Sequence, residues 1–157
     1  MIPSHLFNTA LRKPRVSVVI PVRNGKDYLQ EALDSVLQQS FTDLELLLIN
    51  DGSTDDDYDR YALQDTRIRV IHLTGTGVSR ARNVGMAQSR GELIAFLDAD
   101  DVWFPGKLEA QVRYFDAHPD VGVVFGKFIR WPALPGGGFA PANSLIQDVA
   151  PLTKTEE

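Results

Sequence analysis

Short apolar runs rich in β-branched residues alternate along the chain with segments of helical character. The apolar runs have the length of buried strands and cover residues 16–22, 44–49, 68–73, 93–97 and 121–125. Helices are predicted over 26–39, 56–64 and 78–88, and then where Leu108, Val112 and Phe115 form one apolar stripe. This alternation predicts an α/β fold, a mostly parallel sheet flanked by helices.

Proline and glycine mark the expected boundaries of these elements. Pro105 suits the first turn of the last predicted helix, and Gly91 is expected to close the helix over 78–88. After Trp131, proline and glycine crowd a stretch that has no clear period. We therefore expect three parts: an N-terminal extension over 1–14, one domain over 15–130 and an irregular tail over 131–157.

Length and composition fit one globular domain and exclude several classes of function. The 157 residues include 16 basic and 21 acidic side chains, for a formal net charge of -5, so a nucleic acid partner is not expected. The chain has no cysteine, and His5, His72 and His118 are far apart in the sequence, which excludes thiolate chemistry and disfavours a histidine metal site. No apolar run approaches the roughly 20 residues of a membrane span. A cytoplasmic protein is therefore expected.

Candidate chemistry gathers at the carboxyl ends of the predicted strands, where open parallel sheets bind their ligands. The clearest signal is Asp98-Ala99-Asp100-Asp101, directly after the fourth strand. Clustered carboxylates repel one another, so they need a cation or hydrogen-bond donors. Mg²⁺ and Mn²⁺ bind such oxygens together with substrate phosphates. A solvated acidic loop before the next helix is an equal alternative for this segment by itself.

A second acidic cluster, residues 51–57, follows the second strand. The cluster does not match a calcium-binding EF-hand loop. Counted from Asp51, Asp56 and Ala62 stand where that loop requires glycine and glutamate. Asp55 is interpreted as a helix cap. Asp51 lies at the strand end, where its carboxylate could accept a hydrogen bond from a nucleobase N–H.

A third candidate is the glycine turn before the helix over 78–88. Gly75 and Gly77 leave exposed backbone before a helix start, which favours anions. The turn is no dinucleotide fingerprint, because Arg80 occupies the place of the last glycine. Arg80 and Arg82 cannot face the same way on a helix, so one is expected to approach a diphosphate; two surface cations are the alternative.

Four segments, in this order, resemble the nucleotide-binding half of the family 2 glycosyltransferases, which have the Rossmann-like GT-A fold. They are VSVVIPVRNGKDYLQEALDSVLQQSF, ELLLINDGSTD, GVSRARNVGMAQSRGELIAFLDADD and WFPGKLE. The resemblance runs from about Arg15 to Phe125. Four motifs in one order are far more specific than any of them separately.

The resemblance implies roles for the matching positions. The implied donor-binding residues are Pro21, Val22, Arg23, Asn24, Asp51, Arg82 and Asp98. Asp51 would contact the base, as in relatives that use uridine diphosphate sugars, and Asp98 would hold the ribose side. Asp100 would coordinate Mn²⁺ or Mg²⁺, with Asp98 and Asp101 as weaker metal ligands. The family often has an aromatic residue at the position of Arg23, whose guanidinium can also stack on a base.

The implied reaction transfers a sugar, with inversion, from a nucleotide diphosphate sugar to a hydroxyl of a saccharide or lipid-linked acceptor. A UDP-sugar is the favoured donor, and a lipid-linked acceptor would bring the protein to the cytoplasmic face of the membrane. The D-x-D motif of the family matches Asp98-Ala99-Asp100 here. The family's general base lies well beyond this motif, and Asp148, Glu156 and Glu157 do not align with that base. We therefore expect the base to be absent and the chain to be truncated, a fragment or a degenerate short homologue.

Two function classes stay open. A glycosyltransferase domain is favoured, and the alternative is a non-catalytic nucleotide-sugar-binding module, or an inactive fragment, that lacks the acceptor half. A phosphoacceptor regulatory domain would need an acidic pair where Arg23 and Asn24 stand. A sugar nucleotidyltransferase would need a glycine-rich basic loop there.

Overall fold

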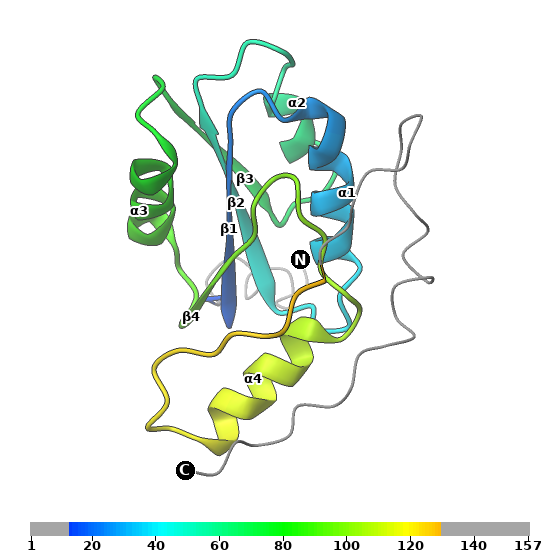
Figure 1. Ribbon diagram of the computed structural model, residues 1–157, viewed down its shortest axis with the longest axis vertical. Coiled ribbons are helices and arrows are strands. Elements are labelled where there is room, and N and C mark those ends of the chain that lie inside the picture. Colours follow the sequence, from blue (N-terminus) through cyan, green and yellow to red (C-terminus); the bar gives the residue numbers. More distant parts are fainter. Residues whose placement is uncertain (1–12, 130–157) are drawn as a thin grey trace, which may run out of the picture. The chain divides into compact units, whose positions relative to one another are not determined.

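The computed structural model describes residues 13–129 and contains a four-stranded parallel sheet (Figure 1). The strand order is β3-β2-β1-β4, and all neighbouring strands run parallel. The elements are β1 (Val16–Val22), α1 (Lys26–Leu37), β2 (Leu44–Asp51), α2 (Asp59–Ala62), β3 (Ile68–Leu73), α3 (Val78–Gln88), β4 (Leu93–Phe96) and α4 (Lys107–Ala117). The predicted α/β class is confirmed. The chain divides into two compact units, Met1–Pro119 and Asp120–Glu157, and these elements all belong to the first.

β1 and β2 form the centre of the sheet, and every residue of both strands is buried. Because alternate strand residues face opposite sides, β1 contributes to two apolar clusters. On one side Val18 packs with Leu29 and Leu33 of α1. On the other side Val19 packs with Ala81 of α3, and Figure 1 shows these two helices on opposite faces of the sheet. Burial on both faces explains why the two strands are continuous apolar runs in the sequence.

The predicted strand over 121–125 is wrong, because residues 121–129 contain neither strand nor helix. A strand is stable only when its backbone N–H and C=O groups pair with a neighbour. Within residues 13–129 the sheet consists of four strands and none of them pairs with 121–125. An apolar β-branched run is not sufficient to form a strand, because its sequence does not specify a partner. Of the expected extension over 1–14, residues 1–12 lie outside the described residues, as does the whole expected tail over 131–157.

The helix predicted over 78–88 has the bounds of α3, whereas α1 and α2 are shorter than predicted and the last helix begins later. α1 ends at Leu37 and α2 covers only Asp59–Ala62. Pro105 lies in a turn before α4, and Gly106 caps the helix with a φ of 78°. A residue at positive φ cannot continue a right-handed helix, so Pro105 cannot belong to its first turn. No helix within the described residues has the length and apolar character needed to cross a membrane.

Gly91 does not close α3 as predicted, because that helix ends at Gln88 with Ser89 as its C-cap. Gly91 instead lies against the start of β1. A Cβ atom there would be 2.5 Å from the backbone nitrogen of Ser17, and the Gly91 N–H donates to the Ser17 hydroxyl at 2.8 Å. The glycine is therefore required by close packing of two backbones and not by a helix end.

Glu45, on β2, lies near the opposite end of the sheet from the polar strand ends and is buried. Its carboxylate accepts hydrogen bonds from the Ser17 hydroxyl at 2.7 Å, the Arg90 N–H at 2.7 Å and the Arg69 guanidinium at 3.1 Å. Burial opposes ionisation and is the largest single influence, but the three donors together outweigh it and lower the pKa of Glu45. The carboxylate thus ties β1, β2, β3 and the segment before β4 together.

Replacing Gly91 with alanine should destabilise the fold. The new methyl group would meet backbone that cannot move away, and overpacking of this kind costs about 2 kcal/mol or more. Urea unfolding followed by circular dichroism measures the change. Gly122→Ala is the matched control, because a Cβ there meets no atom within 4 Å. Equal stabilities of the two variants would contradict the close-packing role of Gly91.

Glu45 should give the fold a defined dependence on pH. Its pKa lies below the ordinary value of 4.5 in the folded state, so its stabilisation is fully present above that value and is lost as pH falls through the lowered pKa. We expect wild type to exceed Glu45→Gln in stability at pH 7 and the gap to shrink below pH about 4.5. Denaturant titrations of both proteins across this range measure the gap, and a constant gap would contradict the assignment.

Candidate functional site

A pocket of about 480 Å³ lies at the carboxyl ends of β1 and β4. Its walls come from three places in the sequence: the end of β1 with the start of α1, the start of α3, and the segment after β4. The lining residues are Pro21, Val22, Arg23, Asn24, Gly25, Tyr28, Val78, Arg82, Asp98, Ala99 and Asp100. Of the sequence-predicted site residues, this pocket brings together all but Asp51 and Asp101.

An ion pair connects two walls of the pocket. The guanidinium of Arg82, on α3, donates to the Asp98 carboxylate at 2.5 Å. Both side chains stay partly exposed, so the pair is open to a ligand. Arg80 is exposed and does not line the pocket, in keeping with the expectation that the two arginines face different ways.

The carboxylates after β4 influence one another. Burial raises the pKa of Asp101, and the charges of Asp100 and Asp98 raise it further. Asp98 and Asp100 line the pocket, whereas Asp101 does not. The backbone N–H of Asp101 donates to the Asp98 carbonyl at 3.0 Å, which closes a tight turn in this segment.

The two pocket carboxylates fit a metal that takes most of its ligands from elsewhere. Within residues 13–129 no three His, Cys, Asp or Glu side chains are grouped closely enough to hold an ion by themselves. Mg²⁺ and Mn²⁺ are commonly held by one or two carboxylates while substrate phosphates and water supply the other oxygens. Asp98 and Asp100 provide that number, and their mutual repulsion favours a cation.

Asp51 lies beside the pocket and not in its lining, with only 3% of its surface exposed. One carboxylate oxygen accepts from the Thr76 N–H at 2.7 Å and the Thr76 hydroxyl at 3.0 Å, and the other accepts from the Gly77 N–H at 2.7 Å. These hydrogen bonds lower the pKa of Asp51. The Thr76 N–H has the largest effect, burial opposes it, and the Gly77 N–H lowers the pKa further. Asp51 therefore fixes the glycine turn that leads into α3.

Within the second acidic cluster, Thr54 and Asp55 hold the loop between β1 and α1. The Lys26 N–H donates to Asp55 at 3.1 Å, and the Tyr58 hydroxyl donates to the same carboxylate at 3.0 Å. Asn24, at a φ of 53°, accepts from the Thr54 N–H at 2.9 Å. Asp55 thus caps the start of α1, across the loop, and not the helix that follows it in sequence.

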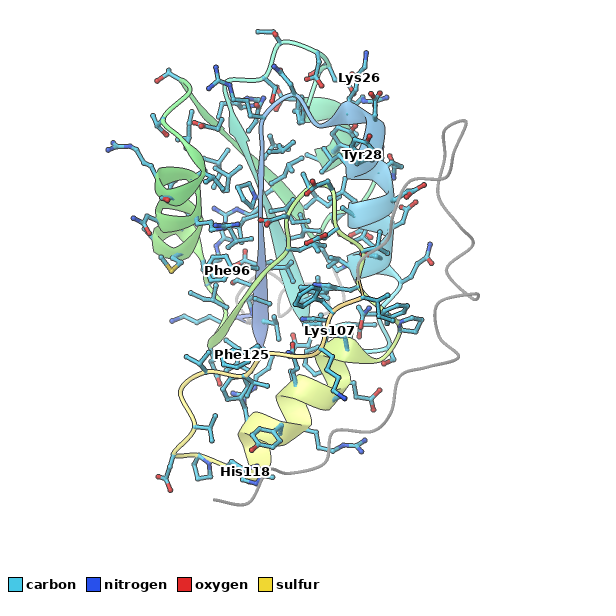
Figure 2. The ribbon with its side chains drawn as sticks, in the orientation of Figure 1. Lys26, Tyr28, Phe96, Lys107, His118 and Phe125 are labelled. Atoms are coloured by element: carbon cyan, nitrogen blue, oxygen red, sulfur yellow. The ribbon has the colours of Figure 1, made fainter. Side chains whose placement is uncertain are left out.

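Four residues of the pocket lining, Gly25, Tyr28, Val78 and Ala99, are not among the sequence-predicted site residues. Tyr28 belongs to an apolar stripe of α1, yet 46% of its surface is exposed (Figure 2). Val78 is the first residue of α3 and is also exposed. The sequence did offer a signal for Tyr28 and Val78 as pocket residues. Each is an apolar side chain in the first turn of a helix that begins at the carboxyl edge of the sheet.

Glycosyltransferases of other organisms are similar in sequence to most of this chain. An uncharacterized glycosyltransferase of Rickettsia bellii is 38% identical over 72% of this chain and 17% of its own length. The glycosyltransferase GlyG of Streptococcus pneumoniae is 32% identical over 77% of this chain and 41% of its own. The chain thus spans less than half the length of either relative.

Solved structures match in fold. S. aureus TarS 1-349, solved in complex with UDP, is 29% identical over 67% of this chain and 33% of its own, with a TM-score of 0.62. The mannosyltransferase PcManGT from Pyrobaculum calidifontis, solved with GDP-Man and Mn²⁺, is 27% identical over 71% of this chain and 35% of its own, with a TM-score of 0.63.

A family model matches most of the chain. The model described as Glycosyl transferase family 2 matches residues 17–131, which include every strand and helix of the first unit except Val16, the first residue of β1. The four-stranded parallel sheet with flanking helices is the GT-A arrangement of these structures. This chain belongs to glycosyl transferase family 2.

Proposed function

We propose that this domain binds a nucleotide diphosphate sugar in the pocket and supplies the donor side of glycosyl transfer. The observation that carries the proposal is the convergence of the β1 end, the start of α3 and the D-x-D segment on one pocket. The complexes of TarS with UDP and UDP-GlcNAc and of PcManGT with GDP-Man support a nucleotide-linked donor. The favoured donor is a UDP-sugar.

The nucleoside would lie against the end of β1. Pro21 and Val22 give this wall an apolar surface, and Arg23 and Asn24 continue it. Arg23 lies beside the glycine turn, since a Cβ on Gly75 would be 3.7 Å from its guanidinium carbon. A planar guanidinium there can stack on a base, while Asp51 either reads the base edge or fixes the turn next to it.

The diphosphate would lie between α3 and the D-x-D segment. Asp100, helped by Asp98, would hold Mn²⁺ or Mg²⁺, and the guanidinium of Arg82 in the same pocket pairs with Asp98. Such an ion, when bound, supplies Lewis-acid stabilisation of the leaving diphosphate. Asp101 is a weaker candidate ligand, because it lies outside the pocket lining.

Sugar transfer to an acceptor hydroxyl, with inversion, is the finer part of the proposal. It requires a general base and an acceptor surface, which we assign to no residue of this chain. A test is incubation of the chain with a UDP-sugar and Mn²⁺, followed by chromatography of the sugar. Release or transfer of sugar supports the enzyme, whereas binding without release supports a nucleotide-sugar-binding module.

UDP with Mn²⁺ should raise the melting temperature, and Asp100→Ala should remove most of the rise. Ligand at 100 times its Kd stabilises by about 2.7 kcal/mol, which for a chain of this size is about 5 °C or more. Differential scanning fluorimetry measures the shift. Asp57→Ala, an exposed aspartate of the other acidic cluster, should keep it. An undiminished shift in Asp100→Ala would exclude Asp100 as a ligand.

Replacing Asp51 with alanine should weaken nucleotide binding while the fold persists. The change leaves the Thr76 and Gly77 N–H groups without their acceptor, so we expect about tenfold weaker UDP binding, or about 1.4 kcal/mol. Calorimetry with UDP and GDP separates two causes. A loss for UDP only indicates base reading, and an equal loss for both indicates displacement of the turn. Unchanged affinity for both would exclude any role of Asp51 in donor binding.

A further inference from the structure

Gln39 lies just beyond the end of α1, and its side chain holds a distant segment. Only 4% of its surface is exposed. Its amide nitrogen donates to the Ser35 carbonyl at 3.0 Å and to the Phe104 carbonyl at 2.9 Å. Its amide oxygen accepts from the Leu108 N–H at 3.2 Å. One buried amide therefore joins α1 to both sides of the turn that begins α4.

A second contact from α1 holds the same segment. The Ser35 hydroxyl accepts from the Trp103 N–H at 3.1 Å and donates to the Ala32 carbonyl at 2.7 Å. The Lys107 ammonium lies 3.8 Å from the centre of the Trp103 ring (Figure 2). Ser35, in the last turn of α1, and Gln39, just beyond its end, thus both reach residues 103–108.

The segment held in this way comes directly after the pocket carboxylates. β4 ends at Phe96, and residues 97–106 contain neither strand nor helix. One end of this stretch is fixed where the Leu97 N–H donates to the Val19 carbonyl at 3.2 Å. The other end is fixed by the Gln39 and Ser35 contacts. Asp98 and Asp100 lie between these two anchors.

We infer that Gln39 is a positioning residue for Asp98 and Asp100, acting through the backbone of residues 101–108 from outside the pocket. The inference rests on the proposed donor site. A side-chain amide is suited to this task because it donates and accepts at once, and here it does both without solvent competition. Removing a group that orients metal ligands without binding the metal itself typically weakens metal affinity by about 10–100-fold.

The test compares two changes at Gln39 with two controls. Gln39→Ala removes all three bonds, whereas Gln39→Glu keeps an acceptor for the Leu108 N–H and loses the donor to the Phe104 carbonyl. Gln38→Ala changes the adjacent, exposed glutamine. Ile68→Val weakens the core at β3, the strand at the far edge of the sheet from β4. It therefore controls for a general loss of stability.

Two measurements are made on each protein: amide hydrogen exchange without ligand, and calorimetry with UDP and Mn²⁺. In Gln39→Ala we expect faster exchange in residues 98–108 and about tenfold weaker uptake of UDP. Gln39→Glu should be at least as impaired as Gln39→Ala, because its buried carboxylate would face the Ser35 and Phe104 carbonyl oxygens, and both controls should match wild type. Unchanged exchange in Gln39→Ala, or equal loss of binding in Ile68→Val, would overturn the inference. If wild type takes up no UDP, the proposed function fails, and exchange in 98–108 still decides whether Gln39 anchors this segment.

Discussion

The parallel pairing of β1 with both β2 and β4 is the constraint on which the site depends. It places β1 in the centre of the sheet and brings the ends of β1 and β4 to one edge. Residues far apart in the sequence, Asn24 and Asp100, thereby line one pocket. The pairing is stabilised by burial of β1 on both faces, against α1 on one side and α3 on the other. The apolar core and the polar pocket are therefore consequences of the same arrangement.

Around this sheet, side-chain hydrogen bonds determine the positions of the loops. Asp51 holds the glycine turn before α3, Asp55 holds the start of α1, and Gln39 holds the turn before α4. Each is an acceptor or amide that satisfies backbone groups which no strand or helix satisfies. Several acidic residues that suggested ligand chemistry in the sequence thus have a structural task. The pocket carboxylates Asp98 and Asp100 differ, because they remain at the surface of a cavity.

Local apolar patterns predicted the four strands of the sheet, and the resemblance to family 2 glycosyltransferases supplied most of the residues that line the pocket. β1 and β3 begin and end where the apolar runs do, and the polar residues after the strands give the pocket lining. Features that depend on distant partners were not predictable. The run over 121–125 has β-forming residues but no neighbouring strand among the described residues, and Gly91 is required by contact with Ser17, which lies far away in the sequence. Tyr28 was not predicted as a pocket residue, because an apolar stripe does not distinguish a core position from a pocket wall.

The pairing of Arg82 with Asp98 has a consequence for which ions the pocket can accept. The guanidinium already neutralises one of the two carboxylates that a cation would meet. A monovalent ion brings no more charge than the group it would displace, and it gains little because Coulomb energy scales with the product of the charges. A divalent ion gains twice as much from each carboxylate. In the donor site that we propose, the Arg82–Asp98 pair therefore favours a divalent ion over a monovalent one.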